Sequence, residues 1–363
     1  MSEILLKKIT YKDLKEKSYE AFDDRFGIAA FITESVRKTF LEYPGYQNDS
    51  DTVAFFLLDG DMVIGRVMKF ATKLKIGEEF VLANSGCATE VCESYRKMGA
   101  GVMLITSDNS NQYDVNFSAM FTEVKIKLLK KQKSIVFEFP QYTKLVGTRV
   151  IFELFHLKGF LLKTISWMAD TLLRLLEVPN KIRAKRLKKR YTVKKETIVP
   201  EWAGEMATND GHKYMEYHDS KWLQWSLDNN LNGYPEDIQS FYAVYDKEGT
   251  PKGFFMTKER LEKEAGRYRN LVRGTIVEWA SADENKLSEG DLNLLALSTF
   301  SRRVSHITTL TVNPVTDKKL KKMGFIVHNI LHMSFKDKTG LYSDASDQSL
   351  WRIRFGCCNT IIY

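Results

Sequence analysis

The chain has 363 residues, of which 44% are hydrophobic, which exceeds the usual size of one domain and is enough for two packed cores. Its four cysteines include no Cys-x-x-Cys pair and its six histidines no finger-type spacing, so the composition argues against a disulfide framework and a bound metal. The formal charge of +8 would favour a polyanionic partner only where the basic residues cluster.

The first residues carry charges too early for a signal peptide, and no stretch approaches the ~20 apolar residues of a membrane span, so we expect a cytoplasmic protein. A strand is expected at 4–9, followed by one or two helices over 14–43, where apolar residues recur at helical spacing. Two apolar runs, 53–58 and 62–67, then flank Asp59-Gly60-Asp61, a sequence typical of a tight hairpin turn.

The rest of the first half continues this alternation. Strands are predicted at 79–83, 88–91, 115–121 and 134–139, and helices directly after Gly101 and at 122–131. Together these elements predict an α/β (α+β) fold, in which helices flank a mixed, mainly antiparallel sheet.

Residues 146–190 differ in character, because apolar residues dominate 152–176 and basic residues dominate 181–190. We interpret this segment as an amphipathic helical connector with a solvated basic end. The alternative is that 181–190 makes weak contact with an anionic membrane surface. No helix-turn-helix, zinc-finger or RNP-like signature accompanies these charges, so we expect no nucleic-acid partner.

From residue 191 the same order of elements begins again. The expected elements are a hairpin of 241–245 and 253–256, a strand at 275–280, a helix at 289–300, a strand at 307–312, a helix at 317–323 and a strand at 325–328. This order indicates an internal structural repeat with little residue identity. We therefore predict a first domain at 1–145, a connector at 146–190 and a second domain at 191–363.

The most informative stretch is the turn Tyr95-Arg96-Lys97-Met98-Gly99-Ala100-Gly101, which follows a predicted strand and opens an apolar helix. Glycines let a ligand approach the backbone, and the amides at a helix start point toward it with the positive end of the helix dipole. Arg96 and Lys97 add charge at the same place. A pyrophosphate fits such a turn, and neither a Rossmann nor a P-loop glycine pattern is present. The alternative is a purely structural glycine turn.

This turn, within this order of elements, resembles the acyl-CoA-binding motif of the GNAT (GCN5-related N-acetyltransferase) superfamily, whose usual form is Arg/Gln-x-x-Gly-x-Gly/Ala. In the second half, the stretch 320–325 resembles the end of the last helix of that family. The resemblance covers most of the chain as two GNAT-like domains in tandem. It implies that acetyl-CoA, or another acyl-CoA, is bound by Val91, Cys92, Arg96, Lys97, Met98, Gly99, Ala100, Gly101 and Val102.

The chain departs from the family pattern at two places. Glu93 stands where the family often has a proline, and the stretch 285–291 replaces the glycine turn in the second half. Acidic residues there would repel a pyrophosphate. We therefore expect the second domain to wall the acceptor site or to pair with the first domain, and not to bind CoA.

Acyl transfer to an amine requires an uncharged amine, a polarised thioester carbonyl and a protonated leaving thiolate. The resemblance implies that the strand at 88–92 splays from its neighbour and offers an amide to the thioester oxygen. Glu90 is the candidate general base, and the alternative is a solvated strand carboxylate. Tyr113 and Tyr142 are candidates for protonating the thiolate, although buried sheet tyrosines are commoner than catalytic ones.

The main prediction is an acetyl-CoA-dependent N-acyltransferase that acts on a small amine or amino sugar by direct transfer, without a metal. The acceptor class rests on the Trp- and Tyr-rich stretch around His212 and His218, which also suits core packing. One alternative is a peptidoglycan-bridge type transferase, since those enzymes pair two GNAT-like domains but use aminoacyl-tRNA. The other is a non-catalytic scaffold docked on a membrane through the basic segment.

Overall fold

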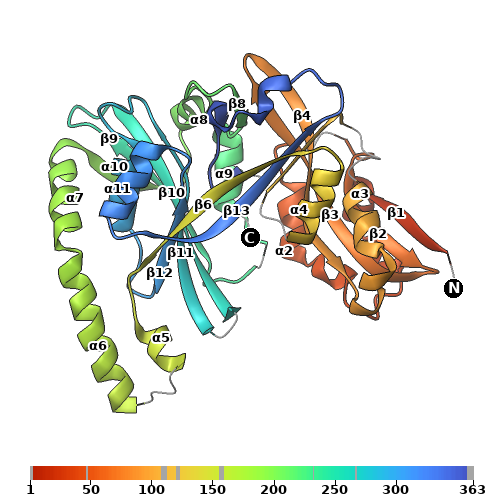
Figure 1. The fold of residues 1–363 in the computed structure, drawn as a ribbon, viewed down its shortest axis with the longest axis horizontal. Helices are drawn as coiled ribbons and strands as arrows, with labels where there is room; N and C mark the ends of the chain where they lie inside the picture. The colour runs from red at the N-terminus through yellow and green to blue at the C-terminus, as the bar shows by residue number, and fades with distance from the viewer. Residues whose placement is uncertain are drawn as a thin grey trace.

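The computed structural model describes residues 3–45, 48–107, 113–119, 123–154, 159–231, 233–265 and 268–357. Figure 1 shows two halves, each with helices against a sheet, joined in the middle by two long strands. The main path of the sheet runs through both halves in the order β1-β2-β3-β4-β5-β13-β6-β12-β11-β10-β9-β7. The predicted fold class, a mixed and mainly antiparallel sheet flanked by helices, is confirmed.

The first half is an antiparallel meander of four strands followed by a fifth strand parallel to the fourth. The strands are β1 Ile4–Thr10, β2 Thr52–Asp59, β3 Met62–Ile76, β4 Glu79–Val91 and β5 Val115–Ala119. The helices are α1 Tyr11–Glu16, α2 Glu34–Leu41, α3 Ala100–Thr106 and α4 Glu123–Lys131, with 3-10 turns at Ser18–Ala21, Ala29–Phe31 and Glu93–Met98. The Asp-Gly turn between β2 and β3 is confirmed, with Gly60 at a φ of +62°.

The second half repeats this plan. Its strands are β7 Thr192–Glu196, β8 Tyr214–Glu216, β9 Ile238–Tyr245, β10 Pro251–Ala265, β11 Tyr268–Ser281, β12 His306–Leu310, β13 Ile326–Asp337 and β14 Trp351–Arg352. Its helices are α8 Glu201–Thr208, α9 Ser220–Asp228, α10 Glu289–Leu297 and α11 Pro314–Lys322, with 3-10 turns at Ser343–Ser346 and Gln348–Leu350. As in the first half, β12 is parallel to the long strand β11.

Two glycines at matching positions make the repeat visible in detail. An added methyl group at Gly65 of β3 would meet a carbonyl of β4 at 3.1 Å and a leucine of α3 at 3.2 Å. At Gly253 of β10 it would meet a carbonyl of β11 at 2.9 Å and a leucine of α10 at 3.3 Å. In each half, therefore, a glycine lets one helix lie close against the sheet.

Two strands are exchanged between the halves. β6, Ile135–Leu145, follows the first half in sequence but pairs with β12 and β13. β13 belongs to the second half but pairs with β5 over Met333–Asp337. Figure 1 shows β6 and β13 side by side across the middle of the molecule. Each half therefore completes its sheet with a strand of the other, and one continuous sheet runs through both halves.

A shared core also joins the halves. Trp225 of α9 donates its Nε1–H to the carbonyl of Thr39 at 2.9 Å, and its ring centroid lies 4.9 Å from that of Tyr43. Phe70 of β3 and Phe254 of β10 lie in the same buried cluster. Burying each large apolar side chain stabilises the fold by about 1.5–3 kcal/mol, so this shared cluster holds the two halves together.

Residues between the halves form α5 Arg149–Leu154, α6 Gly159–Leu176 and α7 Val178–Arg190. α6 and α7 are almost continuous, since the amide of Glu177 donates to the carbonyl of Leu173 and the amide of Lys181 to that of Glu177. In Figure 1, α7 lies beside the second half and α6 extends beyond the sheet. Among the described residues, no helix combines the length and apolar character needed to span a bilayer.

The sequence prediction differs from the structure in specific places. The strands predicted at 79–83 and 88–91 are one strand, because the polar stretch between them pairs with β3. The predicted strand at 134–139 continues to Leu145, and four elements between 192 and 228 were missed: β7, α8, β8 and α9. The predicted strand end at 120–121 and helix start at 122 lie outside the described residues.

Candidate functional site

The glycine turn lies between a 3-10 helix, Glu93–Met98, and α3. Gly99 has a φ of +82°, in the left-handed region that favours glycine, and it ends one helix and caps the next. Within the described chain, a methyl group added at Gly99 would meet no atom within 4 Å, and one at Gly101 only a methyl of Val91 at 3.9 Å. The turn is therefore open on its outer side.

The first two amides of α3 have no carbonyl partner among the described residues. In the described part of the chain, the amides of Ala100 and Gly101 donate to no carbonyl, whereas those of Val102 and Met103 donate to the carbonyl of Gly99 at 2.9 and 3.1 Å. The amides of two predicted ligands, Ala100 and Gly101, thus have no carbonyl partner among the described residues, but only Gly101 is partly exposed, since Ala100 is fully buried. The Val102 amide is used by the helix. Unpaired amides at a helix start favour an anion.

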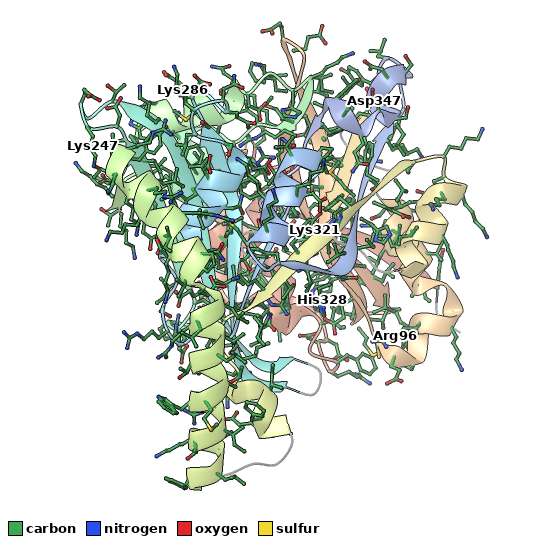
Figure 2. All side chains as sticks on the ribbon, turned by 60° about the vertical axis from the view of Figure 1, so that its left-hand side comes forward. Arg96, Lys247, Lys286, Lys321, His328 and Asp347 are labelled. Carbon is green, nitrogen blue, oxygen red and sulfur yellow. The ribbon has the colours of Figure 1, made fainter. Side chains whose placement is uncertain are left out.

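Two cations stand beside these amides. Arg96 and Lys97 are exposed, and Figure 2 shows Arg96 at the surface of the first half, on the side away from α6 and α7. Arg96 donates its Nε–H to the carbonyl of Val91 at 3.0 Å. Tyr95 donates its hydroxyl to Asp59 at 2.7 Å and ties the 3-10 helix to the first hairpin. The turn is thus fixed to the ends of β2 and β4.

β4 separates from β5 before it reaches the turn. The two strands pair only at Ala83 with Val115 and Asn84 with Asn116, although β4 continues to Val91. The register of β4 against β3 shifts in the same stretch, where Ala88 has a φ of +47°. This bulge bends β4 away from β5. The splay that the resemblance implied for this strand is present.

Glu90 lies in the splayed part of β4 and is held by an arginine. Its Oε2 is 2.7 Å from Nη2 of Arg66, and the Glu90 side chain is 51% exposed while that of Arg66 is 4% exposed. Arg66 also donates to the carbonyl of Ile28 and lies 4.0 Å from the ring centroid of Phe31. Glu90 is accessible, but its carboxylate also neutralises a buried cation.

The remaining predicted residues are not all brought together. Cys92 donates its amide to the carbonyl of Ile64 at 2.8 Å, so this amide belongs to the sheet. The carbonyl of Tyr113 accepts from the side chain of Asn84, which lies seven residues before Val91, or roughly 23 Å along β4.

Tyr142 is also remote from the turn. It lies on β6, where burial and a 2.6 Å hydrogen bond to Asp317 of α11 raise the pKa of its hydroxyl. The structure does not place either tyrosine beside Glu90.

The second half closes the corresponding position. Ser288 caps α10 by accepting from the amide of Asp291, whose carboxylate accepts from Ser288 in return. Lys319 donates to Ser288 at 2.5 Å and fills the space beside Gly290. The start of α10 is thus occupied by its own capping side chains and by Lys319 of α11, in contrast to the open start of α3.

A buried network that no sequence pattern indicated lies in the second half. Arg352 Nη2 is 2.6 Å from Glu278 Oε1, and His218 Nδ1 is 2.8 Å from Glu278 Oε2. His218 stacks on Trp222 with 3.5 Å between ring centroids. Burial opposes its charge, but Glu278 and Glu216 raise the pKa of His218. This confirms that His218 belongs to the packed interior.

The network anchors the last described residues. Gly356 donates its amide to the carbonyl of Val277 in β11 at 2.9 Å, and Phe355 packs against both the shared core and the cluster under β13. The segment 351–357 therefore lies against β11 at Val277, beyond Arg273–Thr275, where the described β11 pairs with β12. The described residues contain no group of three or more metal-ligating side chains.

Comparison with known proteins identifies the fold. No protein-family model matches the sequence, and no curated protein matches it significantly. Solved structures do match: Saccharomyces cerevisiae N-myristoyltransferase with bound myristoyl-CoA has a TM-score of 0.58 at 11% identity, over 93% of this chain and 83% of that one. The chain has the fold of the GNAT-type N-acyltransferases.

Two further structures support this conclusion. A conserved Enterococcus faecalis V583 protein described as a probable N-acyltransferase has a TM-score of 0.56 at 12% identity, over 94% of this chain and 74% of that one. A GCN5-related N-acetyltransferase from Anabaena variabilis has a TM-score of 0.52 at 8% identity, over 93% and 73%. Each match covers at least 93% of this chain and therefore both halves, so the predicted GNAT-like resemblance of both halves is confirmed for the fold.

Proposed function

We propose that this protein is an N-acyltransferase that transfers the acyl group of acetyl-CoA, or of another acyl-CoA, directly to a small amine or amino sugar. The single observation that carries the proposal is the open turn at Gly99. There two amides with no carbonyl partner among the described residues and two cations lie together at the end of a splayed strand. The likeness to N-myristoyltransferase, whose structure holds myristoyl-CoA, supports the same donor class.

The residues of the turn fit a diphosphate. The amide of Gly101, which is partly exposed, is oriented by the first turn of α3 and can donate to a phosphate oxygen without breaking a bond within the described chain. Arg96 keeps its guanidinium at this place through its bond to Val91, and Lys97 adds a second cation. The second half has no equivalent opening at Ser288, so we assign acyl-CoA to the first half only.

The splayed strand supplies the chemistry of transfer. When bound, acyl-CoA would provide an activated thioester. β4 beyond Asn84 shows no pairing with β5 among the described residues, so an amide on this edge of the strand would polarise the thioester carbonyl. Glu90, accessible on the same stretch, would accept the proton of the attacking amine, directly or through water. The second half would then form one side of the acceptor site, since its α9 packs against the first half.

Calorimetric titration with CoA tests the donor site. Gly101→Glu places a carboxylate beside the expected phosphates, and we expect affinity to fall at least about 100-fold through charge repulsion and steric block. Gly101→Ala is the matched control, because its methyl group meets only Val91 at an ordinary distance and should change affinity little. Equal CoA affinity in the wild type and Gly101→Glu would remove the proposed donor site.

A further inference from the structure

α6 exposes an apolar face that nothing in the described chain covers. Phe160, Trp167, Met168, Leu172 and Leu175 are each between 59% and 84% exposed. Their spacing of seven, one, four and three residues places them on one arc of a helix with 3.6 residues per turn. Figure 2 shows the lower part of α6 projecting below the rest of the molecule.

The opposite face of the two helices holds them to the protein. Leu162 and Ser166 of α6 are buried, and Asp170 accepts from the amide and hydroxyl of Thr148 at 2.8 Å. In α7, Asn180 is buried and donates to the carbonyl of Met323 at 3.1 Å. The exposed apolar arc is therefore held outward by fixed contacts on the other side.

The same outward arc becomes basic along α7. Lys185, Arg186 and Lys189 continue the arc at helical spacing and are exposed, and the segment Val178–Arg190 contains no acidic residue. Hydrogen bonds through Glu177 join α6 to α7, and only the Pro179 position lacks a donor, so the apolar and basic stretches follow one another on a nearly continuous helix. Exposed aromatic and aliphatic side chains beside a cationic strip are typical of helices that lie in a lipid interface.

We propose that the outward face of α6 and α7 binds an anionic membrane surface, with α6 in the interface plane and α7 against the headgroups. α6 has 18 residues and is about 27 Å long, and its apolar arc is interrupted by Thr164 and Thr171, which suits shallow insertion. Trp167 is a residue type enriched at the boundary between lipid and water.

The charges favour a membrane over a second copy of the chain. A parallel twofold pair of these helices would bring the two basic strips together, and an antiparallel pair would bury cations against the apolar arc. An anionic bilayer can contact the apolar arc of α6 and the basic residues of α7 at the same time. Juxtamembrane cations each contribute about 1 kcal/mol at such a surface, so three of them are worth about 100-fold in partitioning.

Vesicle co-sedimentation of the full chain tests the proposal. The probes are phosphatidylcholine vesicles with and without phosphatidylserine. We expect binding to the anionic vesicles, reduced about 100-fold by Lys185→Gln, Arg186→Gln and Lys189→Gln together, and weakened by high salt. The matched control changes Lys127, Lys130 and Lys131 of α4 to Gln, which removes the same charge at the other end of the molecule and should leave binding unchanged.

A second variant tests the apolar part. Trp167→Gln, Leu172→Gln and Leu175→Gln together should lower binding at least about tenfold, because they remove insertion and leave every cation in place. Ile198→Gln, equally apolar and 77% exposed elsewhere, is its control. Failure of the wild type to sediment with anionic vesicles would overturn the proposal. So would a vesicle-free dimer, seen by sedimentation velocity, that the three α6 substitutions dissociate.

Discussion

Arg352 and Glu278 form a buried ion pair, with Nη2 2.6 Å from Oε1 and both side chains no more than 2% exposed. Arg352 comes from β14 near the end of the described chain, and Glu278 comes from the middle of β11. Asp210 lies 2.8 Å from Arg352 Nε and adds a second carboxylate to the same guanidinium. This contact ties the segment 351–357 to the sheet of the second half.

Arg352→Leu should destabilise the protein by about 3–5 kcal/mol, because it leaves the buried Glu278 carboxylate without its principal cation. Urea unfolding followed by tryptophan fluorescence measures the change. Lys12→Met is the control, since Lys12 and Glu16 form an exposed pair at 3.9 Å whose loss should cost below about 1 kcal/mol. A loss of stability in Arg352→Leu no greater than in the control would contradict the assigned role.

The stability of the network should depend on pH through His218. Burial opposes the charge, but Glu278 and Glu216 raise its folded-state pKa above the ordinary 6.5. The stabilisation of the folded state by charged His218 is therefore complete below about pH 6.5 and is lost as the pH rises through the raised pKa.

Urea unfolding between pH 5 and pH 9, a range chosen about the ordinary histidine pKa, measures this dependence. His218→Phe keeps the stack on Trp222 but removes the titrating group, so its curve should lack the decline above pH 6.5. An identical decline in the variant would show that another group is responsible.

Arg96 should contribute to the affinity for CoA. Arg96→Ala removes a cation whose place is fixed by the Val91 carbonyl, and we expect affinity to fall about 10- to 100-fold, the worth of a hydrogen bond to a charged group. Calorimetric titration with CoA checks this. Lys130→Ala, an exposed cation on α4, should have no effect, and a similar loss in both variants would indicate only a general charge effect.

Glu90→Gln should lower kcat about 100-fold and leave CoA affinity unchanged, if Glu90 accepts the proton of the amine. The assay follows thiol release from acetyl-CoA with a panel of small amines. Glu93→Gln, an exposed carboxylate three residues away, is the matched control. Should Glu90→Gln lower the melting temperature while kcat stays unchanged, Glu90 would serve only to neutralise Arg66.

The predicted domain 1–145 should not fold alone. Its β5 pairs with β4 at two positions only, and its β6 finds both partners in the second half. Expressed separately, it would expose two unpaired strand edges, and we expect aggregation in size-exclusion chromatography. Co-expression of 1–190 with 191–363 should give a soluble complex, and a monomeric, folded 1–145 would contradict the exchange.

The local elements of this fold could be predicted because their signals are local. Asp59-Gly60 fixed the first hairpin, and Gly99 with Gly101 indicated the open turn, since both depend on backbone freedom at single residues. The repeat of elements indicated two units of one kind. The helix predicted at 317–323 is likewise present, as α11, and ends just before Gly324, which has a φ of +86°.

The long-range features could not be predicted. No pattern in 135–145 or 326–337 distinguishes a strand that pairs within its own half from one that crosses, because both require the same apolar alternation. The Arg66–Glu90 pair and the Arg352–Glu278 pair join residues 24 and 74 positions apart, and a single sequence carries no record of such contacts. The sequence shows that 152–176 is rich in apolar residues, but it does not show which face of the resulting helix stays exposed.

The exchange of β6 and β13 also constrains the order of events during synthesis. The edge of β5 cannot be covered until β13 has been translated, and Ile326 follows Ala119 by 207 residues. At usual elongation rates this interval lasts roughly 10–40 s, during which the nascent first half stays incomplete. A ribosome-bound chain paused before β13 would therefore be a ready target for chaperones.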